Sequence, residues 1–284
     1  MIGLDLQVRP AQLSDHQALS SLIFFETHVH RHLDWRAPLD WLGSPFFWVA
    51  EENGRVQAAL ACPPDPKGVA WLRLFLHGGG IPAAWAWMNL WETARQFIAS
   101  QGGAQVGVIS QQQWMRPLLL DSGFDLTQTI VLLEWQGRPV LMPELPPGLR
   151  LRPMTAGDLP AVAEVDASAF DPFWANSLDS LRRAFPLGAY STVIESDGRL
   201  LAYQLSTGHT LGAHLARLAV RKEAQGQNLG AALVSDLILH IRQRGLSRIT
   251  VNTQNDNRTS LALYQKLGFL RTGEEFPVYR YLVE

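Results

Sequence analysis

The sequence is poor in several features that would place a protein in a particular class. Cys62 is the only cysteine in 284 residues, so neither an intrachain disulfide nor a cysteine-based zinc cluster can form. No apolar run reaches the length of about 18 residues that a membrane-spanning helix needs. Residues 1–10 lack the basic and apolar segments of a signal peptide. These absences predict a cytoplasmic protein with no membrane partner.

Charge of one sign is also scarce. The 24 Lys and Arg residues nearly balance 26 Asp and Glu residues, for a formal net charge of -2. No stretch is rich enough in Lys or Arg to neutralise a phosphate backbone, which argues against nucleic acid as a partner. Hydrophobic residues, by contrast, make up 47% of the chain. That content, with a length beyond about 100–200 residues, predicts two globular domains.

Three short motifs occur twice in the same order, at offsets of 143, 144 and 145 residues. The pairs are Val8-Arg9-Pro10 (then Asp15) with Leu151-Arg152-Pro153 (then Asp158), Asn53-Gly54-Arg55 with Asp197-Gly198-Arg199, and Ser122-Gly123-Phe124 with Leu267-Gly268-Phe269. A nearly constant offset indicates a duplicated domain. The segment 143–148 is rich in Pro and Gly, which continue neither a helix nor a central strand. We therefore predict domains at 1–142 and 149–284, joined by a linker at 143–148.

Periodicity gives the order of elements in the second copy. The predicted elements are a strand at 149–153, a helix at 159–168, strands at 191–195 and 200–207, a strand at 214–220, a helix at 229–244, a strand at 248–253, a helix at 258–267 and final strands. An Asp-Gly pair between the second and third strands favours a hairpin. This order predicts an α/β (mixed α+β) fold, in which helices cover a mixed, mostly antiparallel sheet.

The passage from the strand at 214–220 into the helix at 229–244 has the composition of an anion site. Gly226 and Gly230 let the backbone approach a ligand closely, and the unpaired amides and positive dipole of a helix's first turn favour a phosphate. The alternative is an ordinary strand-to-helix turn in which glycine serves tight packing.

Two blocks of sequence carry a resemblance to a known family. They are Leu218-Ala219-Val220 with Gln225-Gly226-Gln227-Asn228-Leu229-Gly230-Ala231-Ala232-Leu233, and the segment from Asn257 to Phe269 that contains Leu263-Tyr264 and Gly268-Phe269. Together they resemble the GNAT superfamily of N-acetyltransferases, whose coenzyme signature is Arg/Gln-x-x-Gly-x-Gly/Ala. Gln225 and Gly230 match its ends, whereas Asn228 stands where glycine is usual. Asn tolerates a left-handed backbone better than most other residues.

The resemblance implies two tandem GNAT-like domains and an acetyl-CoA-dependent N-acetyltransferase. Acetyl-CoA is then the co-substrate, no metal is needed, and acetyl passes directly to a primary amine of a small molecule or peptide. The protein is expected as a monomer or homodimer. The residues implied in coenzyme binding are Leu218, Ala219, Val220, Gln225, Gly226, Gln227, Asn228, Leu229, Gly230, Ala231 and Asn257. A non-catalytic acyl-CoA-binding or sensor protein is the alternative.

Acetyl transfer to an amine needs a deprotonated amine, a polarised thioester carbonyl and a proton for the departing thiolate. Tyr264 matches the family's proton donor, although it also fits a core aromatic. His214 is the candidate base because imidazole titrates near neutral pH, with a partly buried structural histidine or a chain of waters as alternatives. Glu195 and His209 are interpreted as solvated surface residues. Asn257 also fits a helix cap.

The first copy lacks the recognisable signature. Its junction at 77–82 reads His-Gly-Gly-Gly-Ile-Pro, and its downstream block at 113–120 has a proline but neither the Asn nor the Tyr. This copy is therefore predicted to have lost coenzyme binding and to be structural or acceptor-shaping. It holds nine of the ten tryptophans, which favours core packing over aromatic walls for a substrate. His28, His30 and His32 lack nearby carboxylates and are interpreted as solvated residues, not metal ligands.

Overall fold

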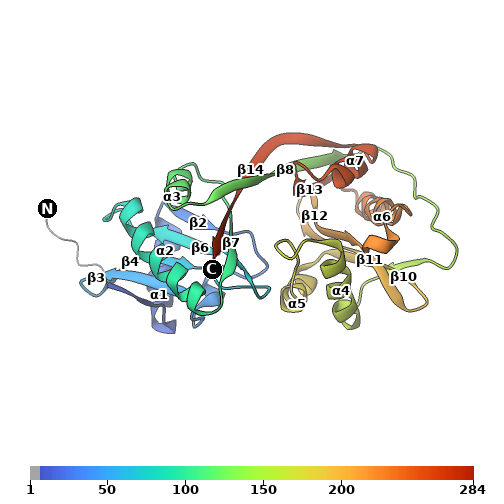
Figure 1. Ribbon diagram of the computed structural model, residues 1–284. Coiled ribbons are helices and arrows are strands. Elements are labelled where there is room, and N and C mark those ends of the chain that lie inside the picture. The colour runs from blue at the N-terminus through green and yellow to red at the C-terminus, as the bar shows by residue number, and fades with distance from the viewer. Residues whose placement is uncertain (1–6) are drawn as a thin grey trace. The chain divides into compact units, whose positions relative to one another are not determined.

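A computed structural model describes residues 7–284 and divides by its contacts into two units (Figure 1). Unit 1 combines the chain up to Thr127 with Phe276–Glu284, and unit 2 is Gln128–Glu275. The elements of unit 1 are β1 (Gln7–Pro10), α1 (His16–Phe25), β2 (Val29–Arg31), β3 (Phe47–Glu52), β4 (Arg55–Ala61), β5 (Val69–Trp71), β6 (Leu74–His77), α2 (Ala83–Ser100), β7 (Ala104–Ile109) and α3 (Met115–Asp121). Two long strands, β8 (Asp125–Gln136) and β14 (Phe269–Val283), run from one unit into the other.

Unit 2 has a related order of elements, with helix α5 in place of β2 and the single strand β12 in place of β5 and β6. It contains β9 (Arg150–Pro153), α4 (Leu159–Ala169), α5 (Leu178–Leu187), β10 (Tyr190–Ser196), β11 (Arg199–His209), β12 (Gly212–Val220), α6 (Leu229–Gln243), β13 (Arg248–Gln254) and α7 (Arg258–Lys266). Short 3-10 turns lie at Leu13–Asp15, Pro38–Trp41, Ala156–Asp158 and Lys222–Ala224. The predicted strands and helices are present in the predicted order, and α5 is an additional helix that the sequence analysis did not predict.

The sheet of unit 2 runs in the order β8-β13-β12-β11-β10-β9, and the pairing of β12 with β13 is parallel while the others are antiparallel. Helix α6 packs on one face through Leu229, Leu233, Leu237 and Ile241, all buried. Their four-residue spacing makes one continuous apolar stripe, which is why the segment is a helix on a sheet. Helix α4 contacts β11 and β12. The predicted mixed α/β fold is confirmed.

Each copy contains the same ion-paired triad of one arginine and two carboxylates. The triads are Arg9 with Asp15 and Glu51, and Arg152 with Asp158 and Glu195, at 2.7 to 2.8 Å between charged atoms. The arginine side-chain hydrogen bonds lower the pKa of Asp158 to about 2. Glu195 is therefore not a solvated residue, as its sequence position suggested, because its carboxylate is held by Arg152. The repeated triad supports duplication, because it joins Arg and Asp of the first repeated motif to Glu51 or Glu195, which lie outside that motif.

Two strands pair with a sheet that belongs mainly to the other sequence repeat. Residues 130–136 of β8 pair antiparallel with β13 in unit 2, and residues 278–283 of β14 pair antiparallel with β7 in unit 1. The predicted domain limits follow the linear repeat, whereas the units divide after Thr127 and after Glu275. A sequence repeat cannot reveal this difference, because strand pairing depends on contacts distant in the chain. Residues 138–149, which include the predicted linker, form no helix or strand.

Aromatic side chains fill the core of unit 1. Trp48, Trp87 and Trp91 are at most 4% exposed, and the rings of Trp87 and Trp91 stack with centroids 5.7 Å apart. The interpretation of these tryptophans as core residues is correct. The interpretation of His30 as solvated is wrong, because its side chain is completely buried and burial lowers its pKa to about 4.

Replacing Tyr279 by Ala tests the strand exchange. Tyr279 lies in the second sequence repeat but is 1% exposed in the core of unit 1. Truncating a buried aromatic side chain costs about 3–5 kcal/mol, so we expect that loss in the unfolding of unit 1. Tryptophan fluorescence in urea follows unit 1, because eight of the ten tryptophans lie before residue 128. Tyr279→Phe is the control, and an unchanged fluorescence midpoint in Tyr279→Ala would contradict the exchange.

Candidate functional site

The sheet of unit 2 opens between β12 and β13. These strands pair for three residues, with Ala213 to Leu215 beside Ile249 to Val251. Beyond that point they pair no further in the described chain, because residues 218–220 stay with β11 and residues 252–254 stay with β8. Each strand follows its outer neighbour, and a gap in the hydrogen-bond ladder opens between them.

Two backbone amides of β12 point into this opening. The N–H of Arg221 donates to Leu201 O of β11 at 2.8 Å. Successive N–H groups of a strand point to opposite sides, so those of Leu218 and Val220 point away from β11, toward the opening. The sequence implicates the same two residues, and the structure shows why their main chain is available to a ligand.

The loop from Gln225 to Asn228 leads from this strand into α6 and is exposed throughout. Gly226 has φ +81° and Asn228 has φ +60°, both in the left-handed region. The Gln225 side chain donates to Val220 O at 3.2 Å, which joins the loop to the end of β12. Asn228 is the N-terminal flanking residue of α6 and its side chain makes no cap. The first-turn amides of α6 are therefore not capped by the Asn228 side chain, and uncapped amides at a helix start favour an anion.

Gly230 has a different role from Gly226. A Cβ at Gly230 would lie 3.2 Å from Leu263 Cδ2 and 3.8 Å from Val220 Cγ2, whereas one at Gly226 would meet nothing within 4 Å. Glycine at 230 therefore lets α6 approach α7 and β12 closely. The sequence left open whether glycine here serves tight packing or ligand access. Tight packing applies to Gly230, whereas the backbone at Gly226 is open.

Helix α7 places Tyr264 and Asn257. The Asn257 side chain accepts a hydrogen bond from Ser260 N at 3.1 Å, so the residue caps the helix. Tyr264 is 4% exposed and packs against Phe269 with ring centroids 5.5 Å apart. Burial raises the pKa of its phenol, which keeps the hydroxyl protonated at any physiological pH. Its chemistry suits a proton donor.

His214 lies at the closed end of the opening. Its Nδ1 is 2.8 Å from Thr250 Oγ1, and residues 214 and 250 are partners in the last paired stretch of β12 and β13. Leu218 is the fourth residue after His214, at most about 13 Å away along an extended strand. Burial lowers its pKa, with His209 as a smaller cause. The structure therefore favours the structural interpretation of this histidine, and a water molecule is the better candidate base.

A buried charged group beneath β12 escaped the sequence analysis. Asp166 of α4 is completely buried and accepts two hydrogen bonds from Arg217 at 2.7 and 2.8 Å. The Tyr203 hydroxyl and the backbone N–H of Asn176 also donate to its carboxylate. The only sequence signal was an Asp inside a mostly apolar helical stretch, which does not identify partners 37 and 51 residues away.

This group anchors the segment 170–176, which crosses from β12 toward β8. The Trp174 carbonyl accepts a hydrogen bond from Arg217 at 2.7 Å, and its indole N–H donates to Gln128 Oε1 at 3.2 Å. Gln128 precedes Thr129, whose carbonyl binds Asn255 N just beyond β13. The segment thus spans the two sides of the opening on the sheet face opposite α6. It is positioned to border whatever enters from that face.

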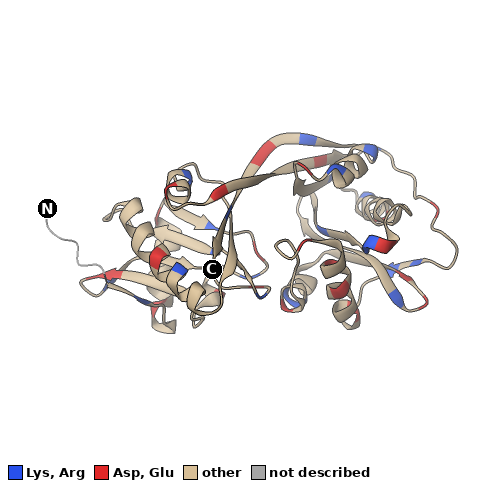
Figure 2. Ribbon diagram, in the orientation of Figure 1, with Lys and Arg blue, Asp and Glu red and all other residues tan. Residues whose placement is uncertain are grey.

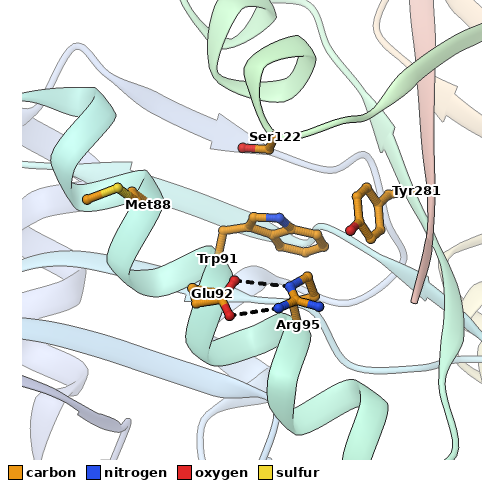
Figure 3. A pocket seen from close by; sticks show the side chains of 6 residues that line it. All are labelled: Met88, Trp91, Glu92, Arg95, Ser122 and Tyr281. Atoms are coloured by element: carbon orange, nitrogen blue, oxygen red, sulfur yellow. Dashed lines mark hydrogen bonds and ion pairs between the residues drawn. The ribbon is translucent and has the colours of Figure 1, made fainter. Parts of the chain in front are cut away.

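A separate pocket of about 330 Å³ lies in unit 1 and is lined by Met88, Trp91, Glu92, Arg95, Ser122 and Tyr281 (Figure 3). The two charged residues pair with each other at 2.7 Å, and Ser122 accepts a hydrogen bond from the Trp87 indole. Glu92, Arg95 and Ser122 are thus already engaged with protein atoms.

Other kinds of site have little support in the described part of the chain. Residues 7–284 contain no group of three or more His, Cys, Asp or Glu side chains that could hold a metal ion. Within the same residues, no helix has the length and apolar character that crossing a membrane requires. Charges of both signs are interspersed over the ribbon of each unit (Figure 2).

Comparison with known proteins identifies one domain of the chain. The sequence model of the acetyltransferase (GNAT) family matches residues 159–269. These residues therefore form a GNAT domain. The matched range contains the opening between β12 and β13, the loop at 225–228 and helix α7, so the GNAT domain coincides with the site described above.

The curated relatives and the solved structures extend the comparison beyond this domain. The mycothiol acetyltransferase of Saccharomonospora viridis is 31% identical over 145 residues, which cover 45% of this chain and 47% of that protein. That of Thermomonospora curvata is 29% identical over 212 residues, 70% of this chain and 60% of that protein. A tandem GNAT protein from the clavulanic acid biosynthesis pathway has a TM-score of 0.63 at 17% identity, covering 99% of both chains. The chain therefore has two GNAT-like folds, one after the other in the sequence.

Asn228 provides a test of the loop. Its left-handed backbone suits Asn or Gly but costs other residues about 1–2 kcal/mol. We expect Asn228→Gly to keep coenzyme A affinity and Asn228→Val to weaken it about 5- to 30-fold, since about 1.4 kcal/mol corresponds to a factor of ten. Titration calorimetry measures both. Asn53, at φ +50° in unit 1, gives the matched control, because Asn53→Val strains a turn without touching the loop. Equal coenzyme A affinities for Asn228→Val and the unmodified chain would contradict the expectation that the left-handed backbone at Asn228 shapes the binding loop.

Proposed function

We propose that the GNAT domain of unit 2 binds acetyl-CoA and transfers its acetyl group to a primary amine of a small molecule or peptide. The observation that carries this proposal is the opening between β12 and β13, which leads directly to the exposed loop at 225–228. Amides of one strand and of one helix end thus line a continuous path for an extended ligand that carries phosphates. The adenosine diphosphate end of the coenzyme suits the loop, and the pantetheine arm suits Leu218 and Val220.

The proposed reaction uses few groups of the chain. The amine nitrogen attacks the thioester carbonyl carbon, the carbon–sulfur bond breaks, and the thiolate takes a proton from the Tyr264 hydroxyl. The amine gives up its own proton to water, since His214 lies at the closed end of the opening, and a proton from water then restores the Tyr264 hydroxyl. Main-chain N–H groups of β12 stabilise the negative charge that develops on the carbonyl oxygen, because they are fixed in place before the reaction.

The acceptor is proposed to enter from the face of the segment 170–176. Phe170 and Trp174 provide aromatic surface there, and Arg217 lies against Phe170 with its guanidinium 3.6 Å from the ring centroid. The curated relatives are named mycothiol acetyltransferases. Their name supports an amine acceptor of low molecular mass for this chain, with the identity of the amine to be found by assay.

A direct assay separates this function from a non-catalytic acyl-CoA sensor. The full chain is mixed with acetyl-CoA and a panel of primary amines that includes amino sugars, cysteinyl conjugates, polyamines and short peptides. With at least one amine, we expect acetyl-CoA to release free coenzyme A thiol. The mass of that amine should rise by about 42 Da, because an acetyl group replaces one hydrogen. Saturable coenzyme binding without thiol release on any amine would favour the sensor.

Tyr264→Phe tests the chemical step. Loss of a general acid typically slows a reaction about 100-fold or more, so we expect a fall of that order in kcat while coenzyme A affinity stays unchanged. Tyr190→Phe is the matched control, because the Tyr190 hydroxyl binds Asp236 at 2.9 Å and the residue lies on β10, which β11 separates from β12. If the two variants turn over equally fast, Tyr264 is not the proton donor.

A further inference from the structure

The strand pairing shows which parts of unit 1 correspond to the opening in unit 2. In unit 1, Leu60 pairs with Phe75 and Ala58 with His77; in unit 2, Gln204 pairs with Leu218 and Ala202 with Val220. The residues of β4 and β11 in these pairs differ by one constant offset of 144, and so β6 is the counterpart of the open part of β12. Phe75 and His77 therefore take the places of Leu218 and Val220.

The backbone of unit 1 separates in the same way. Residues 69–71 of β5 pair parallel with residues 105–107 of β7, as β12 does with β13. Further along, the N–H of Gly78 donates to Gln57 O at 2.7 Å, which matches the bond from Arg221 to Leu201. The amides of Phe75 and His77 then point away from β4. Unit 1 thus has the same opening.

In unit 1 a strand of the chain itself occupies this opening. Strand β2 pairs antiparallel with β6, with Val29 beside Leu76 and His30 beside Phe75. The N–H of His77 donates to His28 O, and the N–H of His32 donates to Arg73 O, at 3.3 and 3.0 Å. The main-chain groups that remain available in unit 2 are therefore already paired in unit 1.

His30 of β2, and His28 just before the strand, also fill the space with side chains. The His30 ring donates through Nε2 to Leu72 O at 3.2 Å, and its Nδ1 lies 3.4 Å from Gln112 Oε1 beyond β7. This ring thus bridges the two sides of the opening. The His28 ring stacks on His77 with centroids 4.7 Å apart and meets the edge of Trp114 at 5.3 Å.

We infer that β2 is a built-in substitute for the coenzyme arm, which closes the opening of unit 1 and leaves one acyl-CoA site per chain. An extended backbone can replace a pantetheine arm because both offer hydrogen-bond acceptors to the same two strand amides. The role of the opening in unit 2 rests on the proposed function, whereas the closure of unit 1 rests on pairing alone. Unit 1 thus lacks both features proposed for coenzyme binding in unit 2. Its junction at 77–82 lacks the loop signature, and β2 occupies its opening.

Amide hydrogen exchange measured by nuclear magnetic resonance tests this assignment on the full chain. Without coenzyme, we expect slow exchange at Phe75 and His77 and fast exchange at Leu218 and Val220, because only the first pair has acceptors. Added coenzyme A should slow exchange at Leu218 and Val220 alone. Fast exchange at Phe75 and His77 in the free chain, or slowing there on adding coenzyme A, would overturn the inference. If no response appears at Leu218 and Val220 while Phe75 and His77 stay protected, the proposed function fails and the closure of unit 1 stands.

A pair of proline variants tests the role of β2. The N–H of His32 points to β6, so the N–H of Arg31 points away and that of His30 points to β6. His30→Pro removes a bond of the ladder and should abolish protection at Phe75 and His77, whereas Arg31→Pro should retain it. Protection that survives in His30→Pro would overturn the inference.

Titration calorimetry with coenzyme A measures the consequence for binding. A stoichiometry of one per unmodified chain supports the inference, and two per chain overturns it. This measurement stands even if the proline variants do not fold, because it uses the unmodified protein.

Discussion

The backbone donors of a β-strand must be paired or left to a ligand or water, and this constraint governs both halves of the protein. In each half two parallel strands pair over three residues and then separate, because each follows its outer neighbour in the sheet. The separation turns strand amides into binding groups. The loop, the helix end and the buried Asp166–Arg217 pair all derive their place in the site from this one opening.

The two copies each contain such an opening, and the openings differ in what lies in them. In unit 2 no strand of the described chain pairs with the open part of β12 on that side, and the segment 170–176 is tied down on the opposite face. In unit 1 the corresponding span of chain supplies β2, whose backbone completes the ladder. Unit 1 thereby gains a core that needs no ligand. The exchange of β8 and β14 adds a second dependence, since each sheet includes a strand from the other repeat.

Much of the fold and part of the site could be predicted from local sequence. The repeat, the order of elements, the apolar stripe of α6 and the loop before it all depend on residues close in the chain, and Asn228 adopts the left-handed backbone that its side chain tolerates. His30 and Glu195 were misjudged because burial and ion pairing depend on distant partners, Gln112 and Arg152. Asp166 was missed for the same reason.

The sequence by itself determined that a coenzyme-type loop joins a strand to a helix in the second copy and that the first copy lacks it, because short-range geometry follows from residue type and spacing. Only the tertiary structure decided which amides lie free, which strand completes which sheet, and that β2 occupies the first opening. Hydrogen-bond partners in a sheet are chosen between segments far apart in the chain, and no local pattern specifies that choice.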